Sequence, residues 1–214
     1  MDEWHANNFN VNEGHLGGYI MSRSEPGPSG LAIENSDPET WHPELWLWAM
    51  SALNIRSVLD VGCGEGHAAR FFKTHGCDVV GVDGSRRAQQ NSKIPEQHVL
   101  HDFTNGPWLP QQACELVWSS EFVEHVEEKF CDNFLATFST ATRFVFMTYA
   151  GPDQPGWHHV NCQPQEYWEA KLERIGFFLD KNLTDHARFV AEKGHFARAG
   201  LVFRPTSDSF PPDS

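Results

Sequence analysis

Short apolar runs alternate with amphipathic stretches along most of the chain, from about residue 38 to residue 204. An apolar run bounded by polar or turn-forming residues predicts a buried strand, and apolar positions at helical spacing predict a helix. Strands are therefore predicted over Ser57–Val61, Asp78–Val82, His98–His101, Cys114–Ser119, Phe144–Thr148, Thr184–Val190 and Phe196–Phe203. Strands and helices in alternation build an open, largely parallel sheet with helices on both faces.

Helical periods fall between the strands, near Gly66–Thr74, Val126–Phe138 and Pro164–Ile175. A further helix is predicted to begin at Asp37-Pro38, because Asp suits an N-cap and Pro suits the first turn. Trp41 and Trp48 recur at helical spacing within it and are predicted to pack in the core. The last two strands have no helical period between them, so they are predicted to form an antiparallel hairpin through Ala191–Gly194.

The two ends of the chain differ in composition from this central domain of residues 38–204. Residues 1–37 are rich in Asn, Gly, Ser and Pro and predict an irregular arm. Leu16, Tyr19 and Ile20 within it suggest a flap over a functional site, although the sequence somewhat favours an arm that merely drapes over the core. Residues 205–214 are predicted to be a flexible tail.

The charge and composition restrict the classes of partner. Among 214 residues, 16 are Lys or Arg and 29 are Asp or Glu, a net charge of −13 that argues against nucleic acid bound through a basic face. The sequence contains no apolar run long enough to span a bilayer and no segment with the layout of a signal peptide. It therefore predicts a cytoplasmic protein without membrane contact. The 5 cysteines contain no CxxC pair and are interpreted as reduced thiols.

A glycine-rich turn follows the first predicted strand, in the segment Gly62-Cys63-Gly64-Glu65-Gly66. Glycines leave room for a ligand beside the backbone, and the helix that follows supplies free amide donors. A dinucleotide fingerprint needs a third glycine where this chain has His67, which argues against NAD. The segment therefore predicts a site for a cofactor other than a dinucleotide.

Acidic residues end the next two predicted strands. Asp83 closes the second strand, where a carboxylate can accept hydrogen bonds from both hydroxyls of a ribose. Asp102 and Phe103 close the third, where an acid can accept from an adenine amino group and an aromatic ring can stack on the base. Each acid alone is typical of a helix cap or a turn, but together they predict a nucleoside site.

The segments VLDVGCGEG, GVDGS and HDFT, with the order of strands, resemble the class I S-adenosylmethionine-dependent methyltransferases over roughly residues 37–204. The resemblance implies an α/β fold, a Rossmann-like, doubly wound, mostly parallel seven-stranded sheet that ends in an antiparallel hairpin. It also implies the roles of the cofactor-binding residues. Asp60, Gly62, Gly64 and Gly66 surround the methionine part, Asp83 holds the ribose, and Asp102 and Phe103 contact adenine; Cys63, inside the loop, and Ser119 are the other candidate cofactor-binding residues.

A cluster of metal-ligand residue types follows the fourth strand. If Glu121 opens a helix, Glu124 and His125 face the same side of it. This ExxEH pattern, together with the downstream pair His158-His159, resembles two metal-using branches of the family, the ubiquinone-pathway O-methyltransferases and the small-RNA terminal 2′-O-methyltransferases. The resemblance implies that Glu121, Glu124, His125 and one of the two histidines hold Mg²⁺, Mn²⁺, Fe²⁺ or Zn²⁺.

Metal-free methyltransferases carry a similar motif, so the sequence also allows a second interpretation. In it His125 is the base that removes the acceptor's proton, the acids cap a helix, and the histidine pair lies on the surface. Across the two interpretations the candidate catalytic residues are His125, Glu121 and His159.

The predicted function is S-adenosylmethionine-dependent O-methylation of a small polar or sugar acceptor, with metal assistance as one interpretation. One alternative is an RNA-terminal 2′-O-methyltransferase, which the charge of −13 argues against. The other is a catalytically silent subunit that binds the cofactor and offers the Trp41–Trp48 segment to a partner. The sequence leaves the oligomeric state open.

Overall fold

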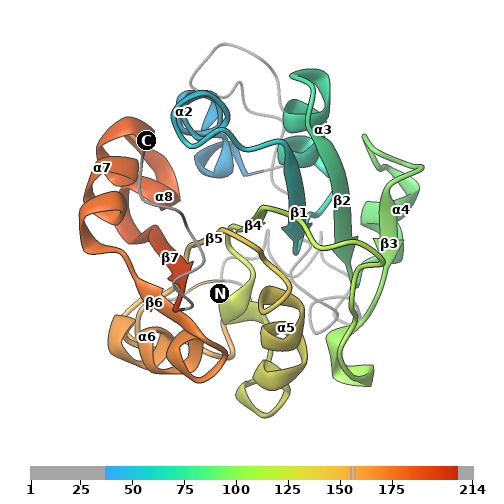
Figure 1. Cartoon of the computed structure of the whole chain (residues 1–214). Coiled ribbons are helices and arrows are strands. Elements are labelled where there is room, and N and C mark those ends of the chain that lie inside the picture. Colours follow the sequence, from blue (N-terminus) through green and yellow to red (C-terminus); the bar gives the residue numbers. More distant parts are fainter. Residues whose placement is uncertain (1–36, 155, 157, 207–214) are drawn as a thin grey trace.

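A computed structural model describes residues 37–154, 156 and 158–206, with one seven-stranded sheet at its centre (Figure 1). The strand order is β3-β2-β1-β4-β5-β7-β6, and only β7 runs antiparallel to its neighbours. This confirms the doubly wound, mostly parallel architecture. The strands are β1 (Ser57–Val61), β2 (Asp78–Asp83), β3 (His98–Leu100), β4 (Leu116–Ser119), β5 (Phe144–Met147), β6 (Phe177–Leu179) and β7 (Leu201–Pro205).

Helices cover both faces of the sheet (Figure 1). The α-helices are α2 (Pro43–Ala52), α3 (His67–Thr74), α4 (Arg86–Gln90), α5 (Cys131–Phe138), α6 (Gln165–Arg174), α7 (Lys181–Ala191) and α8 (Gly194–Ala199). The 3-10 turns are η1 (Pro38–Thr40), η2 (Phe103–Asn105), η3 (Val123–His125) and η4 (Glu128–Phe130). Trp46 and Trp118 belong to the core under α2, α3, α7 and α8, and Phe134 and Trp168 belong to the core under α5 and α6.

The predicted strand over Thr184–Val190 is wrong, because this segment is helix α7. Asp180 caps the helix by accepting a hydrogen bond from the backbone N–H of Leu183 at 2.9 Å. The buried positions Thr184, Ala187 and Ala191 recur at helical spacing. Burial of this stripe outweighs the strand preference of the β-branched residues in the segment.

The predicted hairpin turn at Ala191–Gly194 is also wrong, because helix α7 ends at Ala191 and helix α8 begins at Gly194. The antiparallel partners at the edge of the sheet are β6 and β7, and helices α7 and α8 connect them. The predicted strand Phe196–Phe203 is helical in its first half, and its strand begins only at Leu201. The antiparallel end of the sheet is thus present, but it is formed by a longer connection than predicted.

Two helix starts also differ from the prediction. Asp37 is an N-cap as predicted, with its side chain accepting from Glu39 N at 2.9 Å, but it caps only η1, and α2 begins at Pro43. Helix α5 begins at Cys131 rather than at Val126. Trp41 and Trp48 are partly buried against the core, in line with the packing role predicted for them.

The predicted arm except Asp37, and the predicted tail from residue 207 onward, lie outside the described residues. Within the described part of the chain, the helices are all too short or too polar to cross a bilayer.

Candidate functional site

The glycine loop joins β1 to α3 at the carboxyl ends of the parallel strands. Gly62 has φ +73°, and a Cβ added there would collide with the ring of Phe122. Gly66 has φ +79°, and a Cβ there would lie 2.6 Å from Cγ1 of Ile94. Gly66 begins α3 without a side-chain cap. The loop therefore needs glycine for conformation and space, and it leads into the amino end of an uncapped helix.

Two buried carboxylates flank this loop. Asp83, at the end of β2, accepts hydrogen bonds from Gly64 N at 2.9 Å and Ser85 N at 2.8 Å. Asp60, on β1, accepts from Ala69 N at 3.2 Å. Burial raises the pKa of each carboxyl to about 7, and hydrogen bonds from the backbone oppose the shift. Each carboxylate still has lone pairs for a further donor.

The other predicted cofactor residues have structural contacts of their own. Asp102 caps η2, accepting from Thr104 N at 2.8 Å and Asn105 Nδ2 at 3.1 Å. Phe103 is only 3% exposed, and its ring packs edge to face on Phe122 with centroids 5.7 Å apart. Ser119 donates to Val61 O at 2.9 Å across the sheet. Stacking of Phe103 on a base remains a prediction and requires the ring to leave this packing.

Glu121 does not open a helix, which corrects the local structure predicted for the ExxEH motif. Its φ is +52°, and the turn η3 begins only at Val123. The backbone N–H of Glu121 donates to Thr148 Oγ1 at 2.8 Å, and that hydroxyl donates to Glu121 Oε1 at 3.0 Å. Thr148, which directly follows β5, therefore fixes both the backbone and the side chain of Glu121.

The ligand-type atoms of Glu124, His125 and His159 all lie within 4.8 Å of one another. The imidazoles of the two histidines meet edge to face, with ring centroids 5.0 Å apart. Glu124 O accepts from Val160 N at 2.9 Å and from Asn161 N at 3.1 Å, which holds the loop that carries His159 against η3. Of the predicted metal ligands, Glu121 and His158 lie outside this group of three.

Both imidazoles in this group are oriented by backbone carbonyls. His125 Nδ1 lies 3.2 Å from His158 O, and His159 Nδ1 lies 3.0 Å from Gln154 O. Because a carbonyl can only accept, each Nδ1 carries the proton, and each neutral ring keeps a lone pair on Nε2. A hydrogen bond from the distal nitrogen to a carbonyl is the usual arrangement around a histidine that binds metal.

The carboxyl group of Glu124 is buried and lacks hydrogen bonds from the described residues. The residue is 0% exposed, and neither carboxyl oxygen has a hydrogen-bond partner among the residues that the structure describes. Burial first, and then the charge of Glu121, raise its pKa well above the usual value. Burial and the neighbouring His159 lower the pKa of His125 to about 3, so this ring is neutral near pH 7. A divalent cation would balance the charge of the buried Glu124 carboxylate and would take the two imidazoles as further ligands. The three residues therefore fit such an ion.

His195 is a site residue that the sequence did not indicate. It lies at the start of α8, with Nδ1 3.2 Å from Glu121 Oε2 and Nε2 2.8 Å from Asp37 Oδ2. Burial opposes protonation of the ring, but the hydrogen bond with Asp37 and the charge of Glu121 raise its pKa above the usual value. No local motif marks His195, because its place depends on helices α7 and α8.

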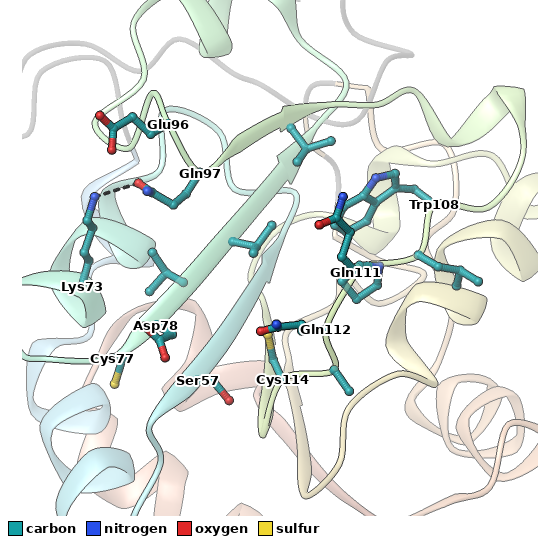
Figure 2. Close-up of a pocket in the computed structure, with 16 residues that line it drawn as sticks. Ser57, Lys73, Cys77, Asp78, Glu96, Gln97, Trp108, Gln111, Gln112 and Cys114 are labelled. Carbon is teal, nitrogen blue, oxygen red and sulfur yellow. Dashed lines mark hydrogen bonds between the residues drawn. The ribbon is translucent and has the colours of Figure 1, made fainter.

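A separate groove of about 1070 Å³ lies at the opposite end of the sheet (Figure 2). Ser57 and Asp78 begin β1 and β2, and both line it. Lys73 donates to Gln97 Oε1 at 2.8 Å on one side of the groove, and Trp108 lies across from that pair. Since ligands of open α/β sheets bind outside the carboxyl ends of the strands, this groove is not the candidate site.

Comparisons with known proteins identify relatives over most of the chain. Residues 31–196 match a family model described as a methyltransferase domain. A ubiquinone biosynthesis O-methyltransferase of Paraburkholderia xenovorans is 29% identical over 188 residues, which are 77% of this chain and 76% of that enzyme. An S-adenosyl-L-methionine-dependent Diels-Alderase of Talaromyces variabilis is 22% identical over 88% of this chain. That alignment covers 65% of the relative, so the chain spans about two thirds of its length.

The fold also resembles that of solved structures. The crystal structure of magnesium protoporphyrin IX methyltransferase from Synechocystis PCC 6803 with bound SAH matches with a TM-score of 0.56 at 14% identity. The match covers 78% of this chain and 81% of that one. At this identity the likeness concerns the fold alone.

Proposed function

This chain belongs to the class I S-adenosylmethionine-dependent methyltransferases, and from that premise we propose that it methylates an oxygen of a small diol-like acceptor with the help of a divalent cation. The observation that carries the proposal is the group formed by the buried Glu124 and His125 with the half-buried His159, at the same end of the sheet as the glycine loop. A small polar molecule and a sugar both offer neighbouring oxygens of the required kind.

The cofactor part of the proposal rests on the glycine loop and its two acids. Asp83 is the proposed ribose ligand, because its carboxylate is anchored by Gly64 N and Ser85 N and keeps lone pairs for two hydroxyl donors. The loop Gly62–Gly66, with Asp60 and Cys63, is proposed to surround the methionine part, and Ser119 to line it. Asp102 and Phe103 keep their proposed place at adenine. The bound cofactor supplies an electrophilic methyl group.

The metal part rests on charge and on lone pairs. Glu124 is a buried carboxyl without a hydrogen-bond partner among the described residues, and beside it lie two imidazoles whose Nδ1 atoms face backbone carbonyls, which directs their Nε2 atoms to a metal in this proposal. Carboxylate with imidazole suits Mg²⁺, Mn²⁺, Fe²⁺ and Zn²⁺. When bound, such a cation supplies Lewis acidity, which lowers the pKa of an acceptor hydroxyl.

Proton removal is assigned to Glu121 in this proposal. The lone pairs of His125 and His159 are committed to the metal, so neither imidazole can also serve as base. The Glu121 side chain is 18% exposed and is held at the carboxyl end of β4 by Thr148 and His195. A carboxylate in that position is able to accept the proton of a hydroxyl whose pKa is already lowered. Methyl transfer itself needs mainly the alignment of donor and acceptor.

The relatives support oxygen as the acceptor atom. The similarity to a ubiquinone biosynthesis O-methyltransferase extends over 77% of the chain. The acidic charge of −13 favours a small acceptor over RNA, although a terminal ribose is also a diol.

The test uses S-adenosylmethionine with an isotope-labelled methyl group, metal-stripped protein, and added Mg²⁺ or Mn²⁺. The acceptors are catechol, a set of simple sugars and a short RNA with a free terminal diol. Label should enter catechol or a sugar only when the metal is present, and Glu124→Gln should abolish the transfer. Equal labelling in the presence of a chelator would contradict the metal, and cofactor binding without any transfer would favour the silent cofactor-binding subunit.

A further inference from the structure

His195 connects two acids that come from distant parts of the sequence. Its Nδ1 lies 3.2 Å from Glu121 Oε2 at the end of β4, and its Nε2 lies 2.8 Å from Asp37 Oδ2, just before η1. Glu39 Oε2 is 3.8 Å from Nε2. The side chain is 20% exposed, so the ring is enclosed largely by these partners. Nε2 thus faces the carboxylates of Asp37 and Glu39, and Nδ1 faces that of Glu121.

Arg198, one helical turn further along α8, completes this acid–base cluster. Its guanidinium pairs with Glu39 Oε2 at 2.6 Å and approaches Nδ1 of His195 at 3.2 Å. The pair keeps Glu39 directed toward α8. The ring of His195 is therefore fixed from η1, from α8 and from the end of β4.

Two side chains from different parts of the chain therefore contact the Glu121 carboxylate. Thr148 Oγ1 donates to its Oε1 at 3.0 Å, and His195 faces its Oε2. Glu121 also has a φ of +52°. Residues other than glycine rarely adopt this backbone conformation, and they keep it only where the surrounding structure holds it. The Glu121 carboxylate acts on the neighbouring Glu124, but it is not one of the three groups whose ligand atoms all lie within 4.8 Å of one another.

We propose that His195 is a positioning residue that holds the Glu121 carboxylate out of the metal group and directs it toward the proton of the acceptor. The inference rests on the proposed function, because it assigns His195 to the same site. His195 acts through Glu121 and touches neither the cofactor nor the acceptor in this account. Its second contact, with Asp37, ties the start of the described chain to the same carboxylate.

The experiment measures kcat and KM for the labelled acceptor in wild type, His195→Ala, His195→Gln, Glu121→Gln and the double variant His195→Ala/Glu121→Gln. His195→Ala should lower kcat about 10- to 100-fold, the range expected when a reacting group is displaced by about 1 Å. KM, cofactor affinity and metal stoichiometry should stay unchanged. His195→Gln should recover part of kcat, because its amide can donate to one carboxylate. The double variant should lose no more than Glu121→Gln alone.

The matched control is His186→Gln, which changes an exposed histidine of α7 that packs against Trp48. It should leave kcat and KM at the wild-type values. Full kcat in His195→Ala, or losses that multiply in the double variant, would overturn the positioning role while the proposed function stands. A wild type that binds no metal and methylates no diol would overturn the proposed function, and the role of His195 with it.

Discussion

The imidazoles of His125 and His159 lie edge to face with their ring centroids 5.0 Å apart, and each donates its Nδ1 proton to a backbone carbonyl. His125 belongs to a turn at the end of β4, whereas His159 belongs to the loop that follows β5. The hydrogen bonds from Val160 N and Asn161 N to Glu124 O bring the two segments together. Two imidazoles whose Nδ1 atoms face backbone carbonyls, beside a buried carboxyl, form a site that a cation would complete.

The adjacent histidines provide a direct test of that site. His159→Asn should weaken Mn²⁺ binding by at least about 100-fold, because even the loss of a residue that only supports a ligand costs up to that amount. His158→Asn should keep the wild-type affinity, because His158 contributes its backbone carbonyl, and Asn tolerates its φ of +52°. Equal losses in the two variants, measured by calorimetry on metal-stripped protein, would count against His159 as a ligand.

The carboxylate of Asp83 should control cofactor affinity. Asp83→Ala removes an acceptor from a buried site, and the cost should be about 1–3 kcal/mol of binding free energy. Asp78→Ala is the matched control, because this residue is exposed at the other end of the same strand and lines the separate groove. If calorimetry shows the same S-adenosylmethionine affinity in Asp83→Ala as in Asp78→Ala, the proposed ribose contact is wrong.

Cofactor affinity should also depend on pH. Burial raises the pKa of Asp83 to about 7 in the free protein, and hydroxyl donors of a ribose would favour the ionised carboxylate. The bound state therefore has the lower pKa, and affinity should fall as pH decreases through about 7. Asp60, with a pKa also raised to about 7, contributes in the same direction. A titration series from about pH 5.5 to pH 8 should show this slope, and Asp83→Ala should reduce it; a flat series would contradict the assignment.

The glycine loop predicts a difference between two glycines that both have positive φ. Gly76 has φ +90° with open space where a Cβ would project, so Gly76→Ala should cost only the backbone term, about 1–2 kcal/mol. Gly62→Ala meets the ring of Phe122 as well and should cost about 1–3 kcal/mol more. Urea unfolding of both variants measures the difference. Equal free energies of unfolding would mean that Phe122 moves aside without cost.

The parts of this fold that local sequence determines were predictable. β1 and the glycine turn after it follow from an apolar run and from glycines that no other residue can replace. The C-terminal region was not predictable in the same way, because Thr184, Phe189 and Val190 favour a strand locally. The helix there is stabilised by burial of Ala187 and Ala191 against the sheet, which the sequence pattern alone does not reveal.

In the candidate site, too, local sequence predicted some residues, whereas others depend on tertiary packing. Glu124 and His125 were identified from their spacing, since adjacent residues in one turn stay close in any fold. The choice between His158 and His159 depended on how one loop packs against η3, and His195 depended on helix α8. Glu121 was identified as a site residue, but its positive φ and its contact with Thr148 turn it away from the helical geometry that its spacing suggested.

The most direct test of the account is calorimetric titration of the metal-stripped chain with S-adenosylmethionine, repeated after addition of Mn²⁺. We expect one cofactor molecule per chain in both titrations, and a separate heat of Mn²⁺ binding that disappears in Glu124→Gln. Absence of cofactor heat at concentrations up to about 1 mM, the upper end of typical enzyme–substrate affinities, would contradict the account.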